Sequence, residues 1–219
     1  MPQKPRSAKR RSRRGTYIVA AVVVIVLIAG GSWYYIQSSG TIRCPAPPAP
    51  MTTNLIYAKL NTSMGIIEVE LFPSAAPQTV ANFVNLSKSG FYDNLVWHRI
   101  VAGFVIQTGD PLTRNGGGNR TLWGTGGSSK TVPLETSGSL HNYVCYLGMA
   151  RSSDPNSGSS QFYINLKNNT SLDGSYTVFG RVISGINVAN DIAKVQVNSN
   201  DQPLDPVYLT SVTILSSGP

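Results

Sequence analysis

The clearest pattern in the chain is a series of short runs in which apolar and polar residues alternate. In Ile66–Phe72 the apolar residues alternate with Glu68 and Glu70. This spacing predicts a half-buried strand with the two glutamates on its solvent face. Runs rich in apolar and β-branched residues predict seven more strands: Leu55–Leu60, Val96–Val101, Val105–Gln107, Val144–Ala150, Gln161–Asn165, Thr177–Val182 and Val207–Leu215. Many short strands of this kind are typical of a β-sandwich or a β-barrel.

Helical spacing is clear in two places only. Ser74–Ser89 predicts a helix, because Pro77 suits a first helical turn and Gly90 suits the position after the last turn. A shorter helix is expected near Val188–Val195. The chain from residue 53 to 219 therefore predicts one mainly β domain with two helices.

The N-terminal region has a different pattern. Ile18–Ala29 is an unbroken apolar run, and the twenty residues Tyr17–Ile36 carry no charge, which is enough to cross a bilayer as a helix. The aromatic residues Trp33–Tyr35 suit a membrane interface. We expect a transmembrane signal-anchor helix at residues 16–36. A cleaved signal peptide is the alternative, since an apolar core of about twelve residues also suits one.

Charge is concentrated before this segment. Residues 1–43 hold eight of the 18 basic residues and no acidic one, so the rest of the chain carries ten of each sign and is neutral. The high net charge is therefore no argument for binding nucleic acid. Residues 1–15 form a basic tail that the positive-inside rule places in the cytoplasm. A single-pass cell-membrane protein with its domain outside the cytoplasm is the expected topology.

Residues 37–52 predict a Ser/Gly/Pro-rich linker, because four prolines between residues 45 and 50 favour an extended chain. The linker contains Cys44, and Cys145 is the second cysteine of the sequence. Two cysteines do not make a disulfide framework. Cys145 lies in an apolar run, so we expect a small buried hydrophobic residue there.

Three blocks of the domain combine polar groups with aromatic ones. The first is Trp97–Pro111, which contains the spacing Arg-x4-Phe-x2-Gln. The second joins Met149–Arg151 to Ser160–Asn165, and the third is Leu172–Val182. Together they resemble the cyclophilins, a family of peptidyl-prolyl cis/trans isomerases, over Thr53–Ser217. The resemblance implies a closed eight-stranded antiparallel β-barrel capped by two α-helices.

The resemblance also implies roles for individual residues. Arg99 would donate a hydrogen bond to the twisted prolyl amide, Phe104 would line the proline pocket beside it, and Gln107 would bond the substrate backbone and hold Arg99 in place. The implied substrate-binding residues are Val105, Tyr163 and Leu172 in the proline pocket, Ala150 and Arg151 through their main chain, Gln161 on the polar side of the groove, and Tyr176, where many members have histidine. No metal and no cofactor are implied. The expected partners are proline-containing polypeptides, bound by a monomer.

Other functions are compatible with parts of the sequence. A membrane-tethered proline-peptide binding module or chaperone with little turnover is the main alternative, and a scaffold for a membrane complex is a more remote one. A zinc site lacks ligands, since His98 and His141 are the only histidines. A serine hydrolase lacks the Gly-x-Ser-x-Gly turn. Many cyclophilins have tryptophan where this chain has Ser171. That tryptophan helps to bind cyclosporin, so weak cyclosporin binding is expected.

Overall fold

The computed structural model describes residues 44–48 and 53–218. The basic tail, the expected anchor at residues 16–36 and most of the linker lie outside these residues. Within the described part of the chain, no helix is both long enough and apolar enough to cross a membrane. The described residues form the domain and the short stretch Cys44–Pro48 that precedes it.

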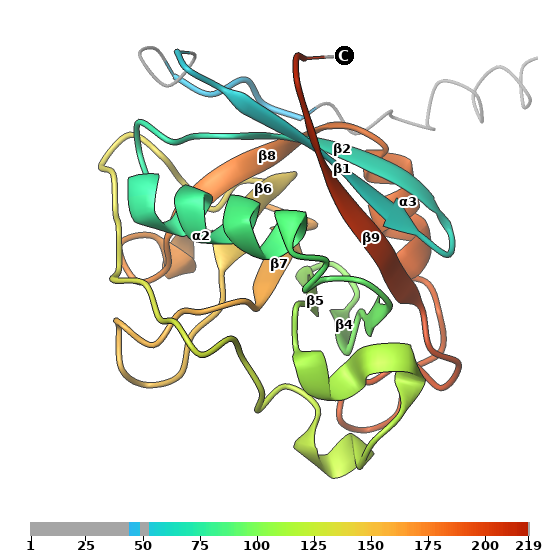
Figure 1. The fold of residues 1–219 in the computed structure, drawn as a ribbon. Coiled ribbons are helices and arrows are strands. Elements are labelled where there is room, and N and C mark those ends of the chain that lie inside the picture. The colour runs from blue at the N-terminus through green and yellow to red at the C-terminus, as the bar shows by residue number, and fades with distance from the viewer. Residues whose placement is uncertain (1–43, 49–52, 219) are drawn as a thin grey trace, which may run out of the picture. The chain divides into compact units, whose positions relative to one another are not determined.

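One antiparallel sheet of nine strands dominates the domain (Figure 1). Its spatial order is β3-β9-β1-β2-β8-β6-β7-β5-β4. The strands are β1 (Ile56–Thr62), β2 (Gly65–Leu71), β3 (Leu95–Val96), β4 (Arg99–Val101), β5 (Val105–Thr108), β6 (Tyr146–Met149), β7 (Phe162–Asn165), β8 (Val178–Ser184) and β9 (Tyr208–Leu215). The expectation of a mainly β, antiparallel fold is confirmed.

The resemblance implies a closed barrel of eight strands, whereas the hydrogen bonds define nine strands in an open order. The segment expected as the single strand Val96–Val101 is divided at Trp97 and His98 into β3 and β4. β3 pairs with β9, whereas β4 pairs with β5, so this segment leaves one edge of the sheet and joins the other. Trp97 and His98 therefore connect the two edges of the curled sheet through the chain. Among the described residues, no strand pairing closes the sheet between β3 and β4.

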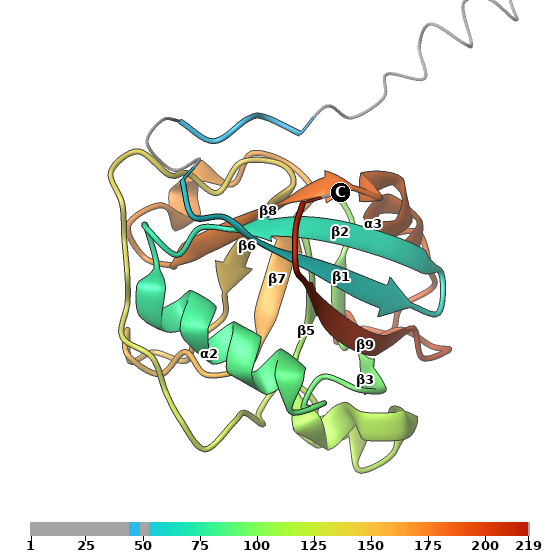
Figure 2. The same ribbon diagram turned by 45° about the horizontal axis from the view of Figure 1, so that its top comes forward.

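Two α-helices lie on opposite sides of the curled sheet (Figures 1 and 2). α2 (Pro77–Lys88) starts at the proline, three residues later than predicted, and its first amides are capped from far along the chain. The Glu135 carboxylate accepts hydrogen bonds from the backbone N–H groups of Gln78 at 3.0 Å and Thr79 at 2.9 Å. A negative charge at a helix N-terminus is stabilising. α3 (Ile186–Ile192) begins two residues earlier than expected.

Three short 3-10 helices complete the domain: η1 (Pro111–Gly116), η2 (Arg120–Leu122) and η3 (Thr170–Leu172). The core beneath α2 is aromatic. Phe83 of α2 packs edge-on against Phe162 of β7, with 5.4 Å between ring centroids, and Tyr92 and Phe179 surround the same position. Helix and sheet are thus joined by buried rings, which bury large apolar areas.

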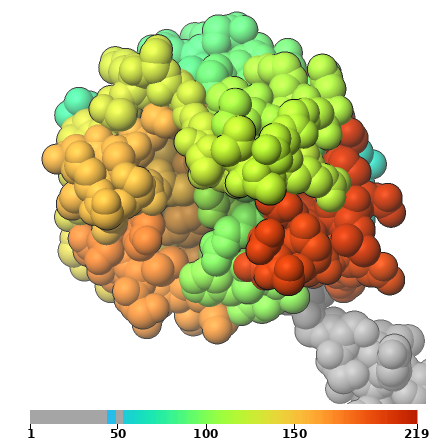
Figure 3. Space-filling model, turned by 90° about the horizontal axis from the view of Figure 1, so that it is seen from below, coloured from blue at the N-terminus to red at the C-terminus, as the bar shows by residue number. Residues whose placement is uncertain are grey.

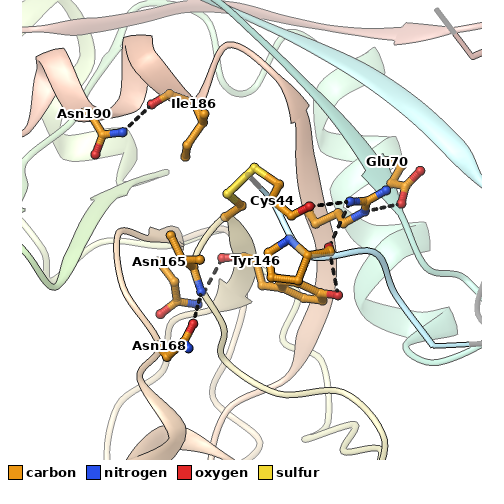
Figure 4. The surroundings of a disulfide bond; sticks show 11 residues. Cys44, Glu70, Tyr146, Asn165, Asn168, Ile186 and Asn190 are labelled. Atoms are coloured by element: carbon orange, nitrogen blue, oxygen red, sulfur yellow. Dashed lines mark hydrogen bonds and ion pairs between the residues drawn. A yellow bond between two sulfur atoms is a disulfide. The ribbon is translucent and has the colours of Figure 1, made fainter. Parts of the chain in front are cut away.

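The two cysteines form a disulfide, which corrects the expectation for Cys145. Cys44 of the linker and Cys145 are bonded across a sequence separation of 101 residues (Figure 4). Cys145 is indeed buried, but it has a positive φ of 76°. A left-handed backbone does not continue a strand, so β6 starts at Tyr146 instead of Val144.

Pro45, next to this disulfide, lies against β6 and β8. The Arg181 guanidinium donates to the carbonyl of Pro45 at 2.9 Å and to the Glu70 carboxylate at 2.6 Å. The Tyr146 hydroxyl donates to the same Pro45 carbonyl at 3.4 Å, and Figure 4 shows these groups around Cys44. Glu70 is therefore buried and ion-paired, not on a solvent face as its alternation predicted. Arg181, which also binds the Pro45 carbonyl, therefore covers the Glu70 end of this face of β2.

Candidate functional site

Strand register brings three of the predicted site residues into one row. Arg99 of β4 is directly opposite Gln107 of β5, and Gln107 is opposite Tyr163 of β7. Tyr163 is in turn opposite Gly148 of β6. Directly opposite residues of antiparallel strands project from the same face. The Tyr163 ring occupies the space where a side chain at position 148 would lie, so glycine is required there.

A cavity of ≈ 320 Å³ opens over this row. Nine of the ten residues that the sequence placed in the site line it: Arg99, Phe104, Val105, Gln107, Ala150, Arg151, Tyr163, Leu172 and Tyr176. Figure 3 shows this face of the molecule hollowed where green atoms lie between orange and yellow-green ones. The cavity combines apolar walls with two guanidinium groups, and no carboxylate is among its lining residues.

The Arg99 side chain is accessible to a ligand. It is 41% exposed, and its guanidinium carbon lies 5.8 Å from the centroid of the Phe104 ring. Its Nε atom is 3.9 Å from the carboxylate of Asp201, which is itself half-exposed. Such an exposed pair contributes little to stability. The aromatic ring and the carboxylate therefore orient the guanidinium while leaving N–H groups available to a ligand in the cavity.

The side chain of Gln107 is held by Gln161. Its Nε2 donates to Gln161 Oε1 at 2.8 Å, and Gln161 Nε2 donates to the carbonyls of Gly124 at 3.0 Å and Gly126 at 2.6 Å. Among the described residues, no side-chain hydrogen bond joins Gln107 to Arg99, and the two residues meet through the pairing of β4 with β5. This chain of amides leaves Gln107 Oε1 as an acceptor for a peptide N–H.

Gln161, the tenth predicted residue, lines a second hollow of ≈ 490 Å³ that continues the first. The two hollows share Gln107, Ala150 and Arg151. The N–H of Ala150 is already bonded to the Gln161 carbonyl at 2.9 Å, so the main-chain contact that Ala150 can offer is its carbonyl. A peptide lying across both hollows would pass this carbonyl.

The loop Gly124–Gly127 belongs to the glycine-dense stretch Gly116–Gly127, whose sequence predicts a surface loop and no part of the site. It forms the wall of the second hollow. The buried carboxylate of Asp110 fixes it by accepting hydrogen bonds from the N–H groups of Gly124 at 2.5 Å and Gly126 at 3.3 Å. A Cβ at position 126 would overlap that carboxylate. Three glycines within the four residues Gly124–Gly127 were the available signal.

Arg151 closes one side of the cavity. Its Nε donates to the Ser175 carbonyl at 2.8 Å, and its guanidinium carbon lies 4.7 Å from the centroid of the Tyr176 ring. The stacked pair joins the second and third sequence blocks. Within the described residues, no group of three or more His, Cys, Asp or Glu side chains is arranged to hold a metal ion.

His98, next to Arg99, is buried, and neither ring nitrogen has a hydrogen-bond partner among the described residues. Burial lowers the pKa of His98 to about 4. The nearby Asp110 carboxylate raises this pKa, but by less than burial lowers it. His98 is therefore neutral at physiological pH. Burial also raises the pKa of Tyr163, so its hydroxyl keeps its proton.

The low pKa of His98 predicts a loss of stability in acid. An unfolded histidine titrates near pH 6.5, so the unfolded chain gains a proton between about pH 6.5 and pH 4 that the folded chain does not bind. From pH 7 to pH 5 we expect the free energy of unfolding to fall by about 2 kcal/mol through this group. Urea unfolding of the wild type and of His98→Gln at both values measures it. An equal fall in both proteins would contradict the assignment.

Comparisons with known proteins agree with this geometry. Residues 57–214 match the family model described as cyclophilin type peptidyl-prolyl cis-trans isomerase/CLD. Peptidyl-prolyl cis-trans isomerase-like 1 of Aspergillus fumigatus is 38% identical over 168 residues, which cover 77% of this chain and 99% of the relative. Peptidyl-prolyl cis-trans isomerase ppi1 of Schizosaccharomyces pombe is 36% identical over 157 residues, covering 72% and 97% of the two chains.

Solved structures show the same likeness. A crystal structure of a Cryptosporidium parvum cyclophilin type peptidyl-prolyl cis-trans isomerase superposes with a TM-score of 0.67 at 30% sequence identity, covering 75% of this chain and 99% of that one. The same protein was also crystallised in the presence of the dipeptide Ala-Pro, and that structure gives a TM-score of 0.66 at 31% identity, covering 74% and 99%.

Proposed function

The chain belongs to the cyclophilin-type peptidyl-prolyl cis-trans isomerases, and we propose that Arg99 is the group with which it accelerates rotation about X–Pro bonds. The barrier to this rotation, about 18–20 kcal/mol, comes from amide resonance. No covalent bond breaks. Catalysis therefore needs a site that binds the twisted amide more tightly than the planar one.

The guanidinium supplies this difference. In the twisted amide the nitrogen lone pair is no longer delocalised and can accept a hydrogen bond, which the planar amide cannot. Arg99 carries a permanent charge and a rigid fork of donors at the edge of the cavity. A charged donor that is already oriented costs little reorganisation when the amide twists.

The other residues bind and orient the substrate. Phe104, Val105 and Leu172 offer apolar walls for the proline ring, and Tyr163 lies in the floor beside them. Gln107 Oε1 can accept a hydrogen bond from the peptide backbone, while Gln161 keeps its amide in place. The observation that carries the proposal is that Arg99, Gln107 and Tyr163 line one cavity in a single row of opposed strand positions.

A binding module with little turnover is the second candidate, because the same cavity could hold a prolyl peptide without twisting it. A protease-coupled assay on a prolyl tetrapeptide separates the two. We expect the wild-type protein to accelerate the cis-to-trans phase in proportion to its concentration. A rate equal to the uncatalysed one, at concentrations where titration shows the peptide bound, would favour the binding module.

We further propose that the domain is anchored through residues 16–36 and works outside the cytoplasm on exported or membrane proteins. The Cys44–Cys145 disulfide supports this location, because disulfides persist in oxidising compartments. The uncharged run Tyr17–Ile36 supports the anchor. Protease added to intact cells should digest the domain and spare a tag on the N-terminus. A domain digested only after lysis would contradict this topology, and the mass of the mature chain distinguishes an anchor from a cleaved signal.

Weak cyclosporin binding remains a prediction. Ser171 is exposed in η3, next to Leu172 of the cavity. A serine there offers little of the apolar contact that a tryptophan provides. We expect Ser171→Trp to tighten cyclosporin binding by roughly 10- to 100-fold, on the scale of an aromatic hot spot, and Ser171→Ala to leave it unchanged. Isothermal titration measures both, and nanomolar binding by the wild type would contradict the prediction.

A further inference from the structure

The floor of the cavity is connected to a buried set of asparagines that take no part in the proposed mechanism. Tyr163 is 4% exposed, and its hydroxyl donates at 2.8 Å to the side-chain oxygen of Asn142. Asn142 is 0% exposed and lies on the loop before β6, outside the cavity lining. A phenylalanine at position 163 would keep the ring but could not make this contact.

Asn142 is itself fixed from two sides. Its backbone N–H and its Nδ2 both donate to Asp173 Oδ1, at 2.7 Å and 3.1 Å. The other carboxylate oxygen of Asp173 bonds His141 Nδ1 at 2.8 Å. Burial would raise the pKa of Asp173, but the hydrogen bonds from Asn142 and His141 outweigh it and the pKa is lowered. The carboxylate is therefore ionised, and bonds to an ionised acceptor are the stronger kind.

The same cluster reaches the end of β7. Asn165 Nδ2 donates to the Asn142 side-chain oxygen at 3.3 Å and to the Tyr146 carbonyl at 3.0 Å, the latter visible in Figure 4. Asn169 Nδ2 donates to Asn165 Oδ1 at 2.7 Å. Buried polar groups that are satisfied in this way define one arrangement of the surrounding chain.

Two walls of the cavity are attached to this cluster. Asn169 Nδ2 also donates to the carbonyl of Phe104 at 3.0 Å, and the Asn169 carbonyl accepts the N–H of Leu172 at 2.9 Å. The Asn142 carbonyl accepts the N–H of Asn169 at 2.7 Å. The floor residue Tyr163 and the wall residues Phe104 and Leu172 are thus tied to neighbouring atoms of one asparagine cluster.

We propose that Asn142 is a positioning residue, which sets the floor of the proline site by holding the Tyr163 hydroxyl. It touches no substrate and acts through Tyr163, whose ring then stays at a fixed depth over Gly148. The inference rests on the proposed function for the identity of the ligand, a prolyl peptide. If the proposal holds, the side chains of Asn142 and Tyr163 are energetically coupled in peptide binding.

A double-mutant cycle tests this coupling. The dissociation constant of a prolyl tetrapeptide is measured for the wild type, Asn142→Ala, Tyr163→Phe and the double variant. We expect each single variant to weaken binding by roughly three- to tenfold, the effect of one buried hydrogen bond. Because each removes the same contact, Asn142→Ala should weaken binding by less than about twofold when Tyr163→Phe is already present. Asn61→Ala, which removes a bond to Ser211 elsewhere in the sheet, is the control and should bind normally.

If Asn142→Ala weakens binding by the same factor in the wild type and in Tyr163→Phe, the proposal is overturned. A merely structural role for Asn142 would give this result, because it would not depend on the Tyr163 hydroxyl. A lower melting temperature of Asn142→Ala does not change this conclusion. If Asn142→Ala does not fold, Tyr163→Phe carries the test alone, and unchanged peptide binding by it would overturn the proposal. The cycle measures peptide affinity, so its result does not depend on whether the protein catalyses isomerisation. A wild type that binds but does not accelerate isomerisation would contradict the proposed function and leave this coupling measurable.

Discussion

Replacing Arg99 with alanine is expected to lower kcat/KM for prolyl isomerisation by about 10²- to 10³-fold, the effect of removing one oriented donor from a transition-state site. The cavity would keep its apolar walls and the amide of Gln107, so a prolyl peptide should still bind within a few-fold of the wild-type affinity. The rate comes from the protease-coupled assay and the affinity from titration of the same peptide.

Two matched variants sharpen this result. Arg99→Lys keeps the positive charge but loses the planar fork, so we expect it to recover only part of the lost rate. Arg120→Ala removes another guanidinium, which stacks on Trp123 at 4.7 Å and does not line the cavity, and it should behave like the wild type. A fall of less than about threefold for Arg99→Ala would show that rotation does not depend on this guanidinium.

Loss of the Cys44–Cys145 disulfide should have the largest effect on stability. The bond closes a loop with a sequence separation of 101 residues, and constraining a loop of that length in the unfolded chain is worth about 4.7 kcal/mol in the chain-entropy treatment. For a domain of this size that corresponds to a fall in melting temperature of roughly 10–20 °C. Thermal unfolding with and without reductant, and of Cys44→Ser, measures it.

The same experiment has an internal control. Neither cysteine lines the two hollows, so we expect kcat/KM of the reduced protein to stay within about twofold of the oxidised value below its melting temperature. Cys44→Ser should match the reduced wild type and should not respond to reductant. A melting temperature that changes by less than about 2 °C on reduction would contradict a stabilising role for the bond.

Much of the architecture was accessible to sequence reasoning because it is local. Alternation in Ile66–Phe72 marked β2, and Pro77 marked the first turn of α2, since both patterns act within a few residues. The row of Arg99, Gln107 and Tyr163 was predicted as a set through the family resemblance. Its physical basis, strand register, appears only when β4, β5 and β7 are paired.

What sequence reasoning missed depends on contacts between distant segments. Glu70 alternates like a surface residue, but it pairs with Arg181, which is more than a hundred residues away in sequence. Cys145 looked like a core residue because its partner Cys44 is far away in sequence and belongs to a linker. The break of the predicted strand at Trp97–His98 reflects a change of pairing partner from β9 to β5, which no local pattern indicates.

The most direct test follows a prolyl peptide bound to the protein by NMR exchange spectroscopy, which reports cis–trans interconversion separately from binding. With Arg99 present, we expect exchange cross-peaks between the two isomers within about a second, where the free peptide takes tens to hundreds of seconds. At the same bound fraction, Arg99→Ala should lose these cross-peaks. Cross-peaks of equal intensity in the two proteins would contradict catalysis by the Arg99 guanidinium.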